Sequence, residues 1–380
     1  MPPEPAAVVS VAPLDQARVE TIIEEFETEA RTRKLAGPTR AIVATVAAGL
    51  SLYALYAATQ TLPAHVYRVV FLGTVLGLTF LYYPPARRWR ARATSLDWLL
   101  VMLACVALGY QLVDFEELIY RGTTPNQWDV IWGSITVLLV LEAARRTTGW
   151  VLPIVAVVFL VYAYLPFTGL VLPDPWGHRG YNLPRIIGHL YITEEGIFGV
   201  PLDVAATFII LFTIYGAVLE YSGAGAFFID FSFAAMGRRR AGAGRTVTLA
   251  SFLLGTVSGS GVATTVTLGS IAYPMMRRAG YDPDSAGGVL SAGGIGAILS
   301  PPVLGAAAFI IAEYLRVSYL QVLVYASVPT LLYYLAVFLT IEIDARRMGT
   351  REVQIQTRPM RQLLRTRGYH FTSLFLVAVL

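Results

Sequence analysis

The sequence predicts an all-α, polytopic membrane protein, from its composition, the length of its apolar blocks and the position of its arginines. Of the 380 residues, 56% are hydrophobic and only 14% are charged, and the mean hydropathy is +0.59. Soluble domains are about half apolar and a quarter charged. The apolar residues gather into blocks of about 20, the length of a membrane-spanning helix. An ordinary cytosolic enzyme is therefore excluded.

The chain begins with a segment, 1–40, that lacks the basic-then-apolar order of a signal peptide. We expect it to be acidic, helical and cytoplasmic. Candidate spans then lie at 41–59, 66–84, 96–113, 128–144, 150–168 and 199–221, with further apolar blocks at 246–276, 286–312 and 317–341.

Basic residues in the connectors predict the orientation, because cytoplasmic loops are enriched in Arg and Lys. The first span is preceded by Arg31, Arg33, Lys34 and Arg40. The second span is followed by Arg87, Arg88, Arg90 and Arg92, and the fourth by Arg145 and Arg146. These connectors and the N-terminus are expected in the cytoplasm. The connector 169–198 contains prolines and acidic residues and is expected on the outer face.

Charge and residue counts exclude several functions. The net charge of +4 is distributed in short runs between apolar blocks, which argues against nucleic-acid binding. The single cysteine, Cys105, excludes an intrachain disulfide. The four histidines have no catalytic or metal-ligating neighbours at useful spacing, so neither an enzyme nor a transition-metal site is predicted.

The block 246–276 departs from the alternating topology, because arginines flank both of its ends. Both flanks are expected in the cytoplasm, so the block must enter the membrane and return. Its centre, 255–261, is rich in glycine, which permits positive φ, and in serine, which can bond freed backbone groups. We predict a re-entrant helical hairpin. The alternative is that these small residues serve only close helix packing.

The tip of this hairpin is a candidate binding site. Irregular backbone at membrane depth is tolerated only where it is buried in protein or lines a wet cavity. The incoming helix ends in carbonyls that suit a cation, and the outgoing helix begins with amides that suit a carboxylate. Thr264 and Thr265 add hydroxyls to the first turn of the outgoing helix.

The block 286–312 is also predicted to contain an interrupted helix. It is rich in glycine up to Gly296 and is broken at Ser300-Pro301-Pro302. Adjacent prolines remove two backbone donors and leave carbonyls free for a cation. The alternative is a simple proline kink. Outside these blocks, Glu142 can pair with Arg145 and Arg146, and Asp203 and Glu220 bracket a span, where we interpret them as interfacial or locally paired residues rather than gates.

These motifs resemble those of a known family. The runs 255–265, 269–276 and 293–302, with the Gly280-Tyr281 turn, are similar to the large membrane subunit of tripartite ATP-independent periplasmic (TRAP) transporters. The spans in 41–168 resemble the small four-helix subunit fused in front, as in the type served by TAXI-class binding proteins. A periplasmic connector, 169–198, would then precede the first half of the transport subunit, 199–345.

The resemblance implies an elevator-type secondary transporter in the bacterial inner membrane that takes a small carboxylate from a periplasmic binding protein and needs no cofactor. Its coupling ion would be sodium, which the lack of Asp, Glu, His, Lys and Arg in 246–276 and 285–311 also favours over protons. Substrate would lie near Ser260, Thr264 and Thr265. The matching ion-site residues are Ser258, Gly259, Ser260, Gly261, Gly293, Gly294, Ser300, Pro301 and Pro302.

The chain departs from the family in showing one hairpin and one broken helix where two inverted halves are expected. After the amphipathic connector that begins 346–380, the last apolar run, 369–380, is too short to span. We expect a truncated chain: a fragment, a frameshifted frame or half of a split protein. The alternative functions are a divalent-anion/sodium symporter without a binding protein, an integral membrane enzyme, and a channel.

Overall fold

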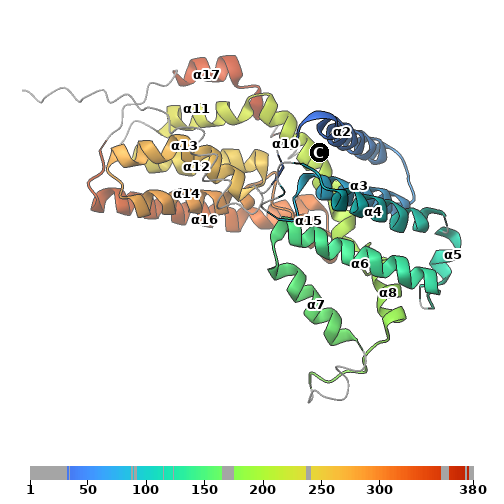
Figure 1. Ribbon diagram of the computed structural model, residues 1–380. Helices are drawn as coiled ribbons and strands as arrows, with labels where there is room; N and C mark the ends of the chain where they lie inside the picture. The colour runs from blue at the N-terminus through green and yellow to red at the C-terminus, as the bar shows by residue number, and fades with distance from the viewer. Residues whose placement is uncertain are drawn as a thin grey trace, which may run out of the picture. The chain divides into compact units, whose positions relative to one another are not determined.

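The computed structural model describes residues 32–33, 35–86, 89, 92–113, 115–122, 124–164, 175–236, 241–351, 359–372 and 375. Helices make up nearly all of the regular structure in these residues, and an isolated bridge joins Tyr164 and Tyr181. The all-α prediction is confirmed. Most of the expected cytoplasmic segment 1–40 lies outside the described residues. The chain divides after Leu211 into two compact units, here called the N-terminal and C-terminal units (Figure 1).

The N-terminal unit has its core between the long helices of the predicted spans. Its helices are α2 (Gly37–Thr59), α3 (Ala64–Tyr82), α4 (Ser95–Val113), α5 (Phe115–Tyr120), α6 (Gln127–Thr148), α7 (Val151–Ala163), α8 (Leu183–Tyr191) and α9 (Val200–Val204). Phe80, Leu108 and Leu139 bring α3, α4 and α6 into one buried cluster. The predicted span 150–168 differs from expectation, because α7 has only 13 residues and 165–168 lie outside the described part.

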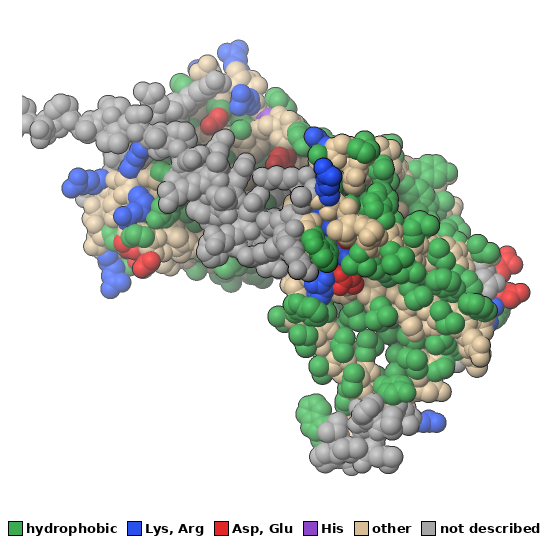
Figure 2. Space-filling view, in the orientation of Figure 1, with side chains coloured by type: hydrophobic (Ala, Val, Ile, Leu, Met, Phe, Trp, Pro, Cys, Tyr) green, Lys and Arg blue, Asp and Glu red, His purple; other side chains and the backbone are tan. Residues whose placement is uncertain are grey.

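Six described helices are long and apolar enough to cross a membrane: α2, α3, α4, α6, the continuous helix Val200–Tyr221, and α16 (Tyr319–Arg347). Many large apolar side chains on them face outward, such as Leu52, Met102 and Leu138. Figure 2 shows broad hydrophobic surface over the N-terminal unit, as contact with lipid requires. These features confirm a polytopic membrane protein.

Buried charges lie where α3 ends, α4 begins and α6 ends. The fully buried Asp97 carboxylate pairs with Arg33 at 2.7 Å and with Arg146 at 2.6 Å. Glu142 pairs with Arg145 at 2.7 Å and with Arg146 at 2.8 Å, which confirms the predicted local pairing. We call these five residues the buried charge cluster. Two of the arginines that predict the topology are thus inside the protein, each held by a carboxylate.

The C-terminal unit is a bundle built around three helices that are not among the candidate spans. Its helices are α10 (Ile210–Tyr221, which starts just before the boundary), α11 (Ala224–Met236), α12 (Gly242–Ser258), α13 (Gly261–Ala279), α14 (Pro283–Ile298), α15 (Ala307–Leu315), α16 and α17 (Met360–Arg367). Figure 1 shows α12, α13 and α14 side by side with α16 along them. Val247, Leu268, Met276 and Ile341 form the core between these helices.

Candidate functional site

The predicted hairpin is present, with its tip at Gly259 and Ser260. Helix α12 ends at Ser258, and Gly259 follows in the left-handed region at φ +57°, where its N–H donates to the Gly255 carbonyl at 2.9 Å. Ser260 caps α13, because its Oγ accepts the Ala263 N–H at 3.3 Å. Two residues therefore reverse the chain, at a left-handed φ that favours glycine. The entry of the hairpin into a membrane stays a prediction.

The predicted break is also present and is more than a kink. Helix α14 starts at a cap from Asp282, whose carboxylate accepts the Ser285 N–H at 2.8 Å, and it ends at Ile298. The chain leaves helical geometry and resumes at Ala307 in α15. The kink alternative is wrong, because the helix is interrupted rather than bent. The Gly305 N–H donates back to the Ile298 carbonyl at 2.8 Å and closes this loop.

Glycines let the tip touch the break. A Cβ added to Gly259 would lie 3.1 Å from Val303 Cγ1 and 3.3 Å from the Val303 carbonyl oxygen. A Cβ on Gly261 would lie 2.5 Å from the Gly294 carbonyl oxygen. Such contacts exclude larger residues without rearrangement. Close packing, the alternative reading of these glycines, thus operates together with the juxtaposition of two irregular backbone segments.

Hydroxyl groups from α16 satisfy the backbone of the break. Thr330 Oγ1 donates to the Leu299 carbonyl at 2.6 Å, and Tyr319 OH donates to the Pro302 carbonyl at 2.9 Å. Tyr319 OH also accepts the Leu304 N–H at 3.1 Å. Tyr334 OH lies 2.9 Å from Ser300 Oγ. We call Tyr319, Thr330 and Tyr334 the α16 hydroxyls, and they replace the intrahelical bonds that the break removes.

The predicted ion-site residues do not all face one point. Gly259, Ser260 and Gly261 lie at the tip, with Gly294 against Gly261, whereas Gly293 lies against Ser251. Ser300 is fully buried and its hydroxyl is bonded to the Gly296 carbonyl at 3.0 Å and to Tyr334. Pro301 borders a groove between α12 and α16, and the Pro302 carbonyl accepts the hydrogen bond from Tyr319 OH. The Ser258 side chain lies outside the described part of the structure.

Sequence reasoning missed the carbonyls that lie against the tip and the hydroxyls behind them. The oxygens beside Gly259 belong to Val303 and Leu304, just after the predicted Ser300–Pro302. Thr330, Tyr333 and Tyr334 share one face of α16 at i, i+3 and i+4, a polar stripe that could have marked this helix. Tyr333 OH donates to the Ala292 carbonyl at 2.7 Å.

A cleft of about 330 Å³ opens on the other side of the tip, between α10, α11 and the hairpin. Its polar residues are Thr213, Glu220, Ser260, Thr264 and Thr267, and Leu254 and Val257 supply apolar wall. We call it the hairpin cleft. Two of the three predicted substrate residues, Ser260 and Thr264, line it. Thr265 lies on the α14 side, where its Oγ1 donates to the Gly261 carbonyl at 2.8 Å.

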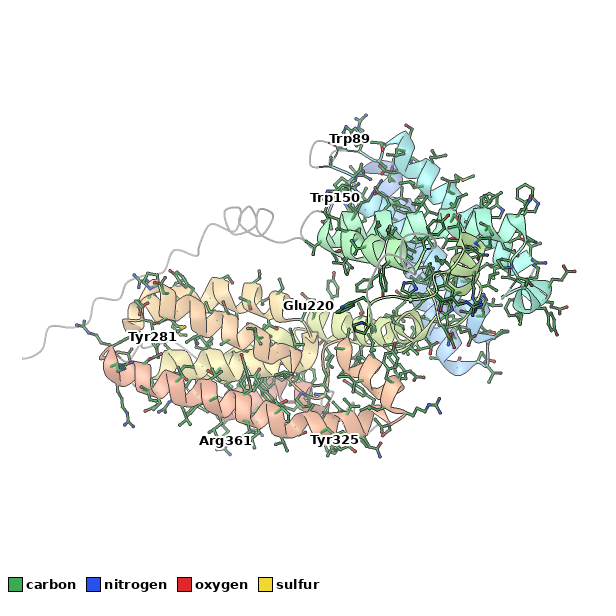
Figure 3. All side chains as sticks on the ribbon, turned by 90° about the horizontal axis from the view of Figure 1, so that it is seen from below. Trp89, Trp150, Glu220, Tyr281, Tyr325 and Arg361 are labelled. Atoms are coloured by element: carbon green, nitrogen blue, oxygen red, sulfur yellow. The ribbon has the colours of Figure 1, made fainter. Side chains whose placement is uncertain are left out.

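The opposite end of the hairpin carries the arginines. Arg277 and Arg278 lie in the last turn of α13, and Arg277 donates to the Tyr281 carbonyl at 2.6 Å. Burial raises the pKa of Tyr281 to about 12, so this side chain stays neutral. Figure 3 shows Tyr281 at this end and Glu220 at the other.

A family model for the DctM component of tripartite ATP-independent periplasmic transporters matches residues 135–380, well over half of the chain. The chain belongs to this family. The match includes the hairpin, the broken helix and α16 and so confirms the resemblance to the large TRAP permease. The helices α2 to α5 precede the matched region.

Curated relatives agree. The chain is similar to the 2,3-diketo-L-gulonate TRAP transporter large permease protein YiaN of Escherichia coli (strain K12), at 30% identity over 28% of this chain and 25% of the relative. It is also similar to the C4-dicarboxylate TRAP transporter large permease protein DctM of Pseudomonas aeruginosa, at 33% identity over 36% and 31%. The matched segments thus span about a quarter to a third of these two relatives. Both are named permeases, which confirms the prediction of a transport protein rather than an enzyme.

Proposed function

We propose that this TRAP permease chain forms part of an ion-gradient-driven secondary transporter that imports a small organic acid across the bacterial inner membrane. The observation that carries the proposal is the contact between the hairpin tip and the helix break. Two interrupted helices that meet at one depth are the usual construction of substrate and ion sites in secondary transporters. Their freed backbone groups supply partial charges of both signs.

The coupling ion in this proposal is sodium, bound between the tip and the break. The candidate residues remain Ser258, Gly259, Ser260 and Gly261 opposite Gly293, Gly294, Ser300, Pro301 and Pro302, now with the Val303 and Leu304 carbonyls added. Backbone carbonyls and hydroxyls are ligands that hard cations prefer. Ser300 would act from behind the site, because its hydroxyl is engaged with Tyr334.

The substrate in this proposal is a small carboxylate delivered by a periplasmic binding protein of the TAXI type. Ser260 and Thr264 in the hairpin cleft, at the amide end of α13, are the groups we assign to it. The relatives named for C4-dicarboxylates and for 2,3-diketo-L-gulonate make an organic acid the natural first choice. The helices in 41–168, α2 to α7, would be the fused small subunit, with a cytoplasmic N-terminus, and the hairpin would move as an elevator.

Uptake in proteoliposomes tests this function. The transport complex that contains this chain, with its binding protein, should accumulate labelled succinate when a sodium gradient is imposed. Ser260→Val removes the α13 cap and narrows the cleft and should abolish uptake. Ser270→Val is the matched control, since Ser270 is exposed on the same helix. Equal uptake by both variants, or uptake that ignores sodium, would contradict the proposal.

A further inference from the structure

Glu220 lies level with the hairpin tip rather than at the arginine end of the bundle. Helix α11, of 13 residues and about 20 Å, separates Glu220 from the arginine end, and α12, of 17 residues and about 25 Å, returns to the tip. Gly225, at the start of α11, lies against Leu254 near the end of α12. Glu220 and Ser260 accordingly line the same cleft.

Depth in the membrane bears on the meaning of this carboxylate. With the arginine end at the cytoplasmic surface, a rise of about 25 Å places the tip within a hydrocarbon core about 30 Å thick, toward its far side. The interfacial position that the sequence suggests for Glu220 stays a prediction. A carboxylate within the core is costly without a cationic partner and marks a functional site.

The surroundings of Glu220 contain hydroxyls but no cation. Among the described residues, no Lys, Arg or His lines the hairpin cleft, and Glu220 has no ion-pair partner. Its side chain is exposed to the cleft. Thr213, Ser260, Thr264 and Thr267 line the remaining polar wall. One carboxylate with several neutral oxygens attracts a positively charged group that hydroxyls can also bond.

We infer that Glu220 is the anionic member of a cation site in the hairpin cleft, filled either by a coupling sodium ion or by the ammonium group of a zwitterionic substrate. The inference rests on the proposed function, since it adds a charged residue to the same transport site. It also narrows the substrate class. A fixed carboxylate in the cleft repels a dicarboxylate unless a cation lies between them, and it favours an organic acid that carries its own ammonium group.

Binding to the full 380-residue chain in lipid nanodiscs tests the inference. The probes are radioactive sodium alone, and the pair succinate and L-aspartate, which differ only in the ammonium group. The variant is Glu220→Gln, and the matched control is Asp230→Asn, an exposed carboxylate on α11 outside the cleft. Loss of one charge-assisted contact should weaken binding by about tenfold or more in the Gln variant.

The sodium measurement and the comparison of L-aspartate with succinate distinguish the two candidate cations. Weaker sodium binding assigns the site to the ion, whereas loss of a preference for L-aspartate over succinate assigns it to the substrate. Glu220→Asp keeps the charge and should restore binding, which separates a charge effect from misfolding. Unchanged binding of all probes by Glu220→Gln, at an unchanged melting temperature, overturns the inference. Failed uptake with this charge-dependent binding intact would instead overturn only the proposed function.

Discussion

The buried charge cluster of the N-terminal unit and the hairpin region of the C-terminal unit both bury polar groups, but by opposite means. The cluster uses full charges in direct ion pairs, with Asp97 between Arg33 and Arg146. The hairpin region uses neutral hydroxyls and backbone carbonyls, as in the bonds from Tyr319 and Thr330. An ion pair satisfies its own members and fixes one geometry. Neutral oxygens carry no net charge of their own. A site built from them can therefore accept and release a positively charged ion.

Removing Asp97 should produce the largest effect. Asp97→Ala leaves the buried Arg33 without a carboxylate partner and Arg146 with Glu142 alone, and unpaired buried charge typically costs about 3–5 kcal/mol. The melting temperature of the purified chain should fall sharply. Asp97→Asn should fall nearly as far, because it keeps the shape and loses the charge.

The double variant Asp97→Leu/Arg146→Met is the control for this prediction. It removes both an anion and a cation, so it should be more stable than Asp97→Leu alone. A double variant no more stable than the single one would mean that the cluster acts through packing and not through charge.

Filling the contact between tip and break should come second. In Gly261→Ala the new Cβ would lie 2.5 Å from the Gly294 carbonyl oxygen, and overpacking of this kind costs about 1–3 kcal/mol. Gly269→Ala on the same helix has no neighbour within 4 Å and should be neutral or slightly stabilising. Melting temperatures of the two variants compare the sites directly. Similar values would show that α13 and α14 do not pack as described.

Removing single hydroxyls at the break should have smaller effects. Tyr334→Phe and Ser300→Ala each delete one partner of the bond at 2.9 Å, and a neutral hydrogen bond contributes about 1 kcal/mol. The double variant should cost less than the sum of the singles, as a double-mutant cycle would measure. Strict additivity would disprove the contact. Tyr333→Phe, which loses a bond to α14 instead, gives the comparison for the break itself.

The sequence predicts the backbone plan of the hairpin region well because that plan depends on local chemistry. Gly259 at positive φ, the Ser260 cap and the interruption after Ile298 all follow from residue types within a few positions. The arginines at both ends of 246–276 likewise predict that the segment returns to the side from which it starts. The roles of these residues in binding ions or substrate stay predictions.

Long-range pairings escape the sequence. Arg33 and Asp97 are 64 residues apart, and Arg146 and Asp97 are 49 apart, so neither helical periodicity nor the topology rule connects them. Ser300 shows the same limit, since its hydroxyl bonds Tyr334, 34 residues later. Side-chain direction in a non-helical segment depends on which helix packs beside it, and local sequence does not contain that information.

The exposed ion pair of Glu117 and Arg121 should show the smallest effect of all. Glu117 pairs with Arg121 at 3.2 Å, but the Glu117 side chain is 78% exposed. Glu117→Gln should change stability by no more than about 0.5 kcal/mol, because solvent and salt screen such pairs. The same melting assay at low and high salt should show a slight salt dependence here and none for Asp97→Ala. A large loss of stability in Glu117→Gln would mean that an exposed charge costs as much to unpair as a buried one. Burial would then no longer explain the stability of the buried charge cluster.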